Sequence, residues 1–95
     1  MIHISQQTEG STTLHIHLEG TLDHEHVVAM REVVREADER RIPQLVLHCE
    51  GLLSVDDSGS AFLLDLERRG ARLVDLPITV SWKLHASDIH SQRTA

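Results

Sequence analysis

The residues with the clearest chemical potential form one short polar segment, Asp56-Asp57-Ser58-Gly59-Ser60. Short polar side chains favour the start of a helix, because their oxygens accept hydrogen bonds from its first backbone N–H groups. The two aspartates and His24 are conceivable neighbours for the Ser58 hydroxyl, as in a nucleophile with its base. The chain has no G-x-S-x-G motif and no glycine-rich phosphate loop, and its 95 residues offer little concavity for a substrate. We therefore expect no enzyme and no catalytic residue.

Eight histidines raise the question of a metal site. His15 and His17 are an i,i+2 pair in a predicted strand, where both imidazoles share one face, and His24 and His26 form a second pair. One further ligand would complete an open zinc site, but no third or fourth ligand is recognisable. The sequence therefore predicts no metal and no other cofactor. The single cysteine, Cys49, has no second thiol and is interpreted as a small buried side chain.

Composition restricts the partners that this chain can have. Nine Lys and Arg against fifteen Asp and Glu give a net charge of −6, and 40% of the residues are hydrophobic. An acidic chain with two aromatic residues lacks the basic surface and stacking platforms that nucleic-acid binding needs. The apolar runs are far shorter than the ~20 residues that span a bilayer, and the N-terminus has no signal-peptide pattern. We expect a single cytoplasmic domain that neither binds nucleic acid nor inserts into a membrane.

The first half of the chain has the pattern of a hairpin followed by a helix. Apolar and polar residues alternate over 14–18, which predicts a strand with one buried face, and Ile2 and Ile4 supply its hairpin partner. Apolar residues then recur at spacings of three and four over 24–40. This predicts an amphipathic helix that begins after the capping residue Asp23.

The second half alternates strands and helices. A nearly continuous apolar run over 45–49 predicts a central strand, and helical spacing predicts a second helix over 58–74. Renewed alternation over 78–84 predicts a last strand, and residues 85–95 form a short polar tail. The order β-β-α-β-α-β predicts an α/β fold, a small mixed β-sheet with helices packed on it.

Three stretches of the chain carry motifs in a fixed order. They are LEGTLD from Leu18 to Asp23, LVLHCEG from Leu45 to Gly51 and VDDSG from Val55 to Gly59. Together they resemble the STAS domain of bacterial anti-sigma factor antagonists, in which G-x-L-D ends the second strand, a central strand and its turn follow, and a D-S-S-G loop opens the second helix. The order and spacing match over about residues 10–84, so the resemblance implies one STAS-like domain over 1–95.

The resemblance also implies a function for the polar segment. In that family the second serine of D-S-S-G accepts a phosphate from a serine kinase that is also the anti-sigma factor, and Ser58 is the matching residue. A phosphate there would meet the positive end of a helix and add about −1.5 to −2 charge beside the aspartates. The surface expected to contact the anti-sigma factor consists of Asp23, His24, Asp56, Asp57, Ser58, Gly59 and Ser60.

Two departures from the family pattern keep other functions open. Asp57 stands where the family has its first serine, and Ser60 stands where an apolar residue is usual. Asp57 places a fixed charge beside the acceptor, which suits a non-switching STAS subunit that docks on the ATPase of a membrane transport complex, such as a phospholipid transporter. A third possibility is a metal- or pH-responsive module that uses its histidines. Only eleven residues follow Leu84, so we expect the C-terminal helix of the family to be short or missing.

Overall fold

The computed structural model describes residues 2–93, with side chains as far as His85. Four strands and three helices follow one another along this part of the chain. Their bounds are β1 (Ile2–Glu9), β2 (Thr13–Leu22), α1 (His24–Glu39), β3 (Gln44–Val55), α2 (Asp57–Arg68), β4 (Arg72–Val74) and α3 (Ile78–Arg93). The predicted α/β fold and the order β-β-α-β-α-β are confirmed, but the last strand is β4 and not the predicted 78–84, and a third helix follows it.

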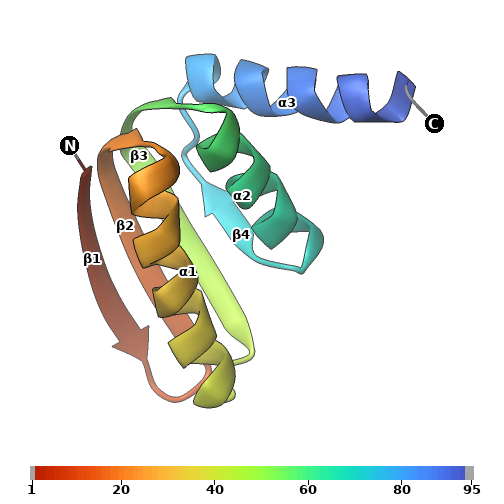
Figure 1. Cartoon of the computed structure of the whole chain (residues 1–95). Coiled ribbons are helices and arrows are strands. Elements are labelled where there is room, and N and C mark those ends of the chain that lie inside the picture. Colours follow the sequence, from red (N-terminus) through yellow and green to blue (C-terminus); the bar gives the residue numbers. More distant parts are fainter. Residues whose placement is uncertain (1, 94–95) are drawn as a thin grey trace.

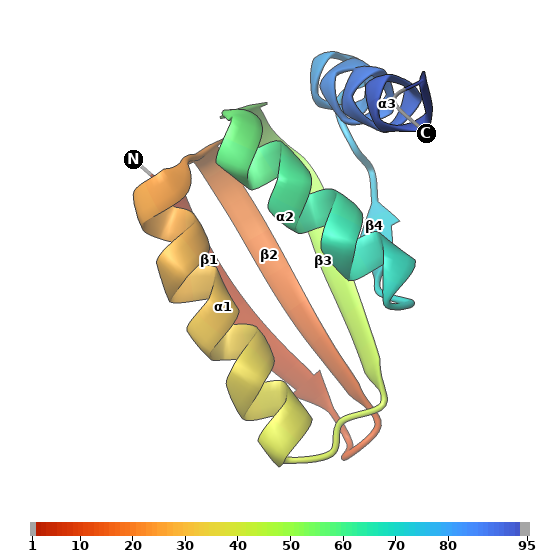
Figure 2. The same ribbon diagram turned by 45° about the vertical axis from the view of Figure 1, so that its right-hand side comes forward.

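The strands form one mixed sheet in the order β1-β2-β3-β4. The hairpin pair β1 and β2 is antiparallel, whereas β3 runs parallel to both β2 and β4. Helices α1 and α2 lie side by side on one face of this sheet, and α3 lies beyond its end, close to the start of α2 (Figures 1 and 2). Because β2 and β3 are parallel neighbours, the helices that follow them start at the same edge of the sheet.

The core fills the space between the sheet and the helices. Alternate residues of β2 and β3 point into it, and the i,i+3 and i,i+4 stripes of α1 and α2 cover them. The fully or nearly fully buried side chains include Leu14, Ile16, Leu18, Val27, Met30, Val34, Leu47, Cys49, Phe62, Leu63 and Leu66. Burial raises the pKa of the Cys49 thiol to about 11, so this cysteine is a packed side chain, as its sequence context predicts.

The prediction of a strand over 78–84 is wrong, because these residues begin α3. Residues that alternate with period two also contain i,i+4 pairs, and here the helical spacing prevails. Val80 and Leu84 are 2% and 3% exposed and pack into the core, whereas Ile78 and Trp82 are 66% and 68% exposed. The helix continues to Arg93, so the tail predicted from residue 85 is helical and the C-terminal helix is neither short nor missing. Residues 94 and 95 of that tail lie outside the described residues.

The second predicted helix is also too long. It ends at Arg68 instead of residue 74, because Gly70 adopts a φ of 102° and reverses the chain. The N–H groups of Gly70 and Ala71 donate to the carbonyl oxygens of Glu67 and Leu66, which is the hydrogen-bond pattern of a Schellman helix end. The residues released from the helix form β4, the fourth strand of the sheet.

None of the helices in residues 2–93 combines the length and the apolar composition that crossing a bilayer requires.

Candidate functional site

The candidate site lies at the carboxyl ends of β2 and β3, where both strands turn into helices. Leu22 and Val55, the last residues of the two strands, are paired in the sheet. The next residues, Asp23 and Asp56, are the N-caps of α1 and α2, and both have extended backbones. We call this end of the sheet the capped end, and it comprises Asp23, His24, Asp56, Asp57, Ser58 and Gly59.

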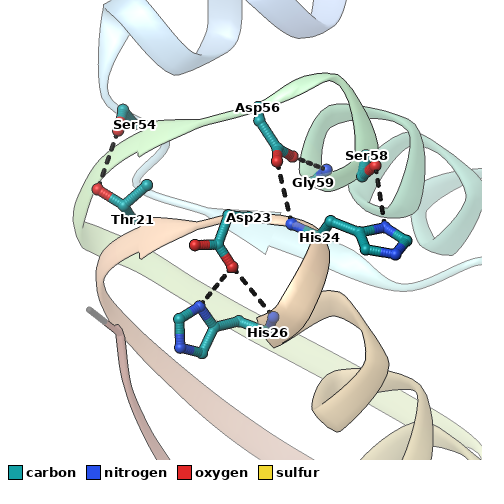
Figure 3. Close-up of polar contacts among 8 residues, drawn as sticks. All are labelled: Thr21, Asp23, His24, His26, Ser54, Asp56, Ser58 and Gly59. Carbon is teal, nitrogen blue, oxygen red and sulfur yellow. Dashed lines mark hydrogen bonds and ion pairs between the residues drawn. The ribbon is translucent and has the colours of Figure 1, made fainter.

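Asp56 ties the two helix starts together. One oxygen of its carboxylate accepts the backbone N–H of Gly59 at 2.8 Å, which caps its own helix. The other oxygen accepts the backbone N–H of His24, the first residue of α1, at 3.0 Å (Figure 3). The Asp56 N–H in turn donates to the carbonyl oxygen of Leu22 at 3.1 Å. A single side chain therefore holds the starts of both helices in register.

Position 59 requires a glycine because the backbone of β2 passes close to it. A Cβ atom at this position would lie 2.4 Å from the carbonyl oxygen of Leu22 and 3.2 Å from its Cγ atom. No L side chain fits at such a separation without movement of β2. The glycine of the D-D-S-G segment thus allows α2 to start directly against the end of β2.

Ser58 lies in the first turn of α2, with its hydroxyl half-buried at the rim of the capped end. Its Oγ atom is 3.4 Å from Nδ1 of His24, which is exposed at the start of α1. Figure 3 shows the imidazole and the hydroxyl facing each other across the gap between the two helices. The sequence prediction that His24 and Ser58 are neighbours is therefore met in the structure.

Asp23 performs the same capping role for α1. Its carboxylate accepts the backbone N–H of His26 at 3.1 Å and contacts Nδ1 of the same residue at 2.6 Å. The backbone hydrogen bond, followed by the imidazole contact, lowers the pKa of the Asp23 carboxyl group from its ordinary value. Asp23 is therefore a charged cap that anchors His26, next to the His24–Ser58 contact (Figure 3).

The remaining predicted contact residues differ in exposure. Asp57 has a fully exposed carboxylate, 3.4 Å from Nζ of Lys83 on α3. Gly59 is buried and Ser60 is 0% exposed, so in this structure they support the loop from below. The exposed rim consists of His24, Asp57 and part of Ser58.

Lys83 is a member of this region that the sequence analysis missed. Besides its contact with Asp57, its ammonium group donates to the carbonyl oxygen of Val55 at 2.9 Å. It thereby holds α3 against the end of β3. The predicted strand over 78–84 gave no reason to place Lys83 near Asp57. Only a helical prediction, with Val80 and Leu84 buried, would have placed Lys83 at this end of the sheet.

A second group of polar side chains lies on the sheet face opposite α1 and α2. We call it the histidine face, and it comprises His15, His17 and His48. Nδ1 of His15 and Nε2 of His48 are 2.9 Å apart, and the rings of His17 and His48 stack in parallel at 4.3 Å between centroids. The spacing in the sequence pairs His15 with His17 and does not reveal His48, which the parallel register of β2 and β3 places opposite His17.

The geometry of the histidine face is that of hydrogen bonding and stacking. The centroids of His15 and His48 are 5.2 Å apart while their nearest nitrogens are at 2.9 Å, so the rings meet edge to edge. The two nitrogens face each other and do not converge on a third point. Among the described side chains, no three His, Cys, Asp or Glu groups form a set that would hold a metal ion.

Comparison with known proteins gives the same fold. The family model described as "Mlab, STAS domain" matches residues 5–79. No curated protein sequence matches the chain.

Among solved structures, the unphosphorylated anti-sigma factor antagonist SpoIIAA is 25% identical, with a TM-score of 0.60. The match covers 70% of this chain and 61% of that one, so this chain matches less than two thirds of that relative. The phosphorylated form of SpoIIAA, a Bacillus cell fate determinant, gives 23% identity and a TM-score of 0.69, covering 90% and 83% of the two chains.

The antisigma-factor antagonist STAS domain from Rhodobacter sphaeroides is 20% identical. Its TM-score is 0.57, and the match covers 78% of this chain and 86% of that one. These likenesses agree with the family model, which matches well over half of the chain. The chain therefore belongs to the STAS domain family.

Proposed function

We propose that this protein is an anti-sigma factor antagonist, a cytoplasmic binding module without catalytic activity of its own. In this proposal the unmodified capped end docks on an anti-sigma factor that is also a serine kinase, and phosphorylation of Ser58 releases it. The observation that carries the proposal is the position of the Ser58 hydroxyl, half-exposed in the first turn of α2 and beside the start of α1. The similarity to SpoIIAA, solved in unphosphorylated and phosphorylated forms, supports it.

The surroundings of Ser58 suit a charge-controlled interface. A phosphate would add about −1.5 to −2 charge beside the exposed carboxylate of Asp57. Charges at the rim of an interface mainly set the association rate and the orientation of the partner, and like charges repel. Phosphorylation of Ser58 would therefore release a partner whose surface is acidic or fits closely, without a change in the fold of this domain.

Exposed apolar side chains on β3, α1 and α3 would supply the binding energy. Leu53 near the end of β3 is 75% exposed, and Val28 in α1 and Trp82 in α3 are also exposed. Interfaces draw most of their energy from a few such anchors, among which tryptophan is enriched. We propose that these three side chains surround the contact that the capped end makes with its partner.

The test is phosphorylation by the cognate kinase. The purified protein is incubated with ATP and a lysate of its source organism, and its intact mass is measured. Ser54→Ala is the matched control, because Ser54 is an exposed serine close by, bonded to Thr21 at 3.0 Å. We expect one added phosphate in the wild type and in Ser54→Ala, and none in Ser58→Ala.

A second function is favoured by one observation, the aspartate at position 57. Its fixed charge, paired with Lys83, makes the loop permanently acidic next to Ser58. This suits a STAS subunit that docks constitutively on the ATPase of a membrane transport complex. If a known antagonist is phosphorylated in the same lysate while this protein is not, partner switching is contradicted, and co-purification with a transport ATPase becomes the next measurement.

A further inference from the structure

We propose that His24 binds the phosphate of phosphorylated Ser58 and holds it over the start of α1. This inference rests on the proposed function, because it assigns a role within the modified state of the same site. Its basis is the contact between Nδ1 of His24 and Oγ of Ser58 at 3.4 Å, which joins the first residue of α1 to the first turn of α2.

The backbone on both sides of this contact is held in place. The Asp56 carboxylate accepts one N–H from residue 24 and one from residue 59, at 3.0 and 2.8 Å. Gly59 packs directly on the end of β2, so α2 has no room to approach more closely. A phosphate on Ser58 must therefore be accommodated in the exposed space at the rim, where the His24 imidazole already lies (Figure 3).

The chemistry of the two groups is matched. Imidazole and a phosphate monoester both titrate close to neutral pH, so each favours the charged form of the other when they are in contact. A protonated imidazole donates a charge-assisted hydrogen bond to a phosphate oxygen, which is stronger than a neutral one. The phosphate would thus be bound by a side chain of the protein itself, and it would cover part of α1 as well as α2.

The other charged groups near this contact compete less well for the phosphate. On α1 and its cap the neighbours are Asp23, Glu25 and His26, and the His26 imidazole is already engaged by Asp23 at 2.6 Å. At the start of α2 they are Asp56 and Asp57, which would repel a phosphate. From α3 comes Lys83, whose ammonium group is bound to the Val55 carbonyl oxygen and lies beside Asp57. His24 is the basic side chain in direct contact with Ser58.

The experiment uses the full chain with phosphoserine incorporated at position 58 during translation, so no kinase is needed. Phosphorus-31 NMR follows the phosphate from about pH 5 to pH 8, across its second pKa near 6. We expect the second pKa of the phosphate to be about 0.5 to 1 unit higher in His24→Gln than with His24 present, because the imidazolium favours the dianion. His26→Gln is the matched control, since it removes a histidine two residues away, and it should leave the phosphate pKa unchanged.

Two results would overturn the proposal. One is an equal phosphate pKa with and without His24 in chains that circular dichroism shows to be folded. The other is a second phosphate pKa that rises in Lys83→Met and stays unchanged in His24→Gln, which would assign the phosphate to Lys83.

The outcome is separable from that of the proposed function. If His24 fails this test while the lysate phosphorylates Ser58, partner switching stands and only the role of His24 is lost. If the phosphate pKa depends on His24 but no kinase modifies Ser58, phosphate binding by His24 is supported and partner switching is not.

Discussion

The capped end and the histidine face both contain imidazoles in close polar contact, but with different neighbours. At the capped end, His24 faces a serine hydroxyl across two helix starts. On the histidine face, His15, His17 and His48 face one another, and the outer nitrogen of His15 lies 3.3 Å from the carboxylate of Glu9. In the proposed function the first arrangement responds to a covalent modification of Ser58, whereas the second presents imidazole nitrogens that take up protons.

The two regions also differ in what holds them. Contacts with the main chain fix the capped end: the Asp56 carboxylate binds two backbone N–H groups, and Gly59 packs on the carbonyl oxygen of Leu22. Side chains alone form the histidine face, which borders an open groove of about 380 Å³. A site that presents one hydroxyl to a partner, as proposed for Ser58, benefits from the first kind of support, because the groups that Asp56 and Gly59 contact belong to the main chain and do not move with a side-chain rotamer. Substitutions at the capped end should therefore cost the most stability.

The largest effect is expected for Gly59→Val. Its Cβ atom would meet the Leu22 carbonyl oxygen at 2.4 Å, so β2 or α2 must shift. Overpacking of this kind costs about 1–3 kcal/mol, and a branched side chain against backbone belongs at the upper end. Urea unfolding monitored by circular dichroism measures the loss.

Ala61→Val is the control for this substitution, because it places the same side chain at an exposed position of α2. It should cost no more than about 0.7 kcal/mol of helix propensity. Equal losses for the two variants would show that the capped end is no tighter than the helix surface.

A smaller loss is expected for Asp56→Ala. This variant removes the cap of α2 and the acceptor of the His24 N–H group together. Loss of an N-cap costs about 0.5–2 kcal/mol, and the second bond places this variant in the upper half of that range. The same unfolding measurement applies, and amide hydrogen exchange at His24 should become faster. Asp57→Ala, which loses an exposed ion pair with Lys83 and a negative charge in the first turn of α2, should cost clearly less stability than Asp56→Ala.

The secondary structure was predicted correctly from the sequence where a pattern is compatible with only one kind of element. The polar segment at Ser58 follows a strand and precedes apolar residues at helical spacing, so a helix start was the consistent interpretation. It failed at Ile78, Val80, Trp82 and Leu84, because their spacing satisfies a strand and a helix equally well. Tertiary packing decides between the two: α3 buries Val80 and Leu84 against the core, and the core surface that receives them is not visible in the local sequence.

The contacts of the candidate site divide in the same way. That Asp23 and Asp56 cap two helices was predictable from residue type and position. That Asp56 reaches across to the His24 N–H depends on the pairing of Leu22 with Val55, which only the sheet register provides. The same register brings His48 to His17.

The smallest effect is expected on the histidine face, as a dependence of stability on pH. Burial, and then the neighbouring His17 and His15, lower the pKa of His48 from its ordinary value near 6.5. The unfolded chain therefore binds this proton more readily than the folded chain does. Stability should fall as the pH drops below about 6.5, until the lower folded-state pKa is passed.

A difference between variants isolates this contribution. Urea unfolding of the wild type and of His48→Gln at pH 7.5 and pH 5.5 should show a smaller loss in the variant. Asp23 does not interfere, because its lowered pKa affects stability only below about pH 5. His3→Gln, an exposed substitution on β1, should behave as the wild type. If His48→Gln keeps the full pH dependence, the histidine face does not titrate on folding, and the two regions differ in packing alone.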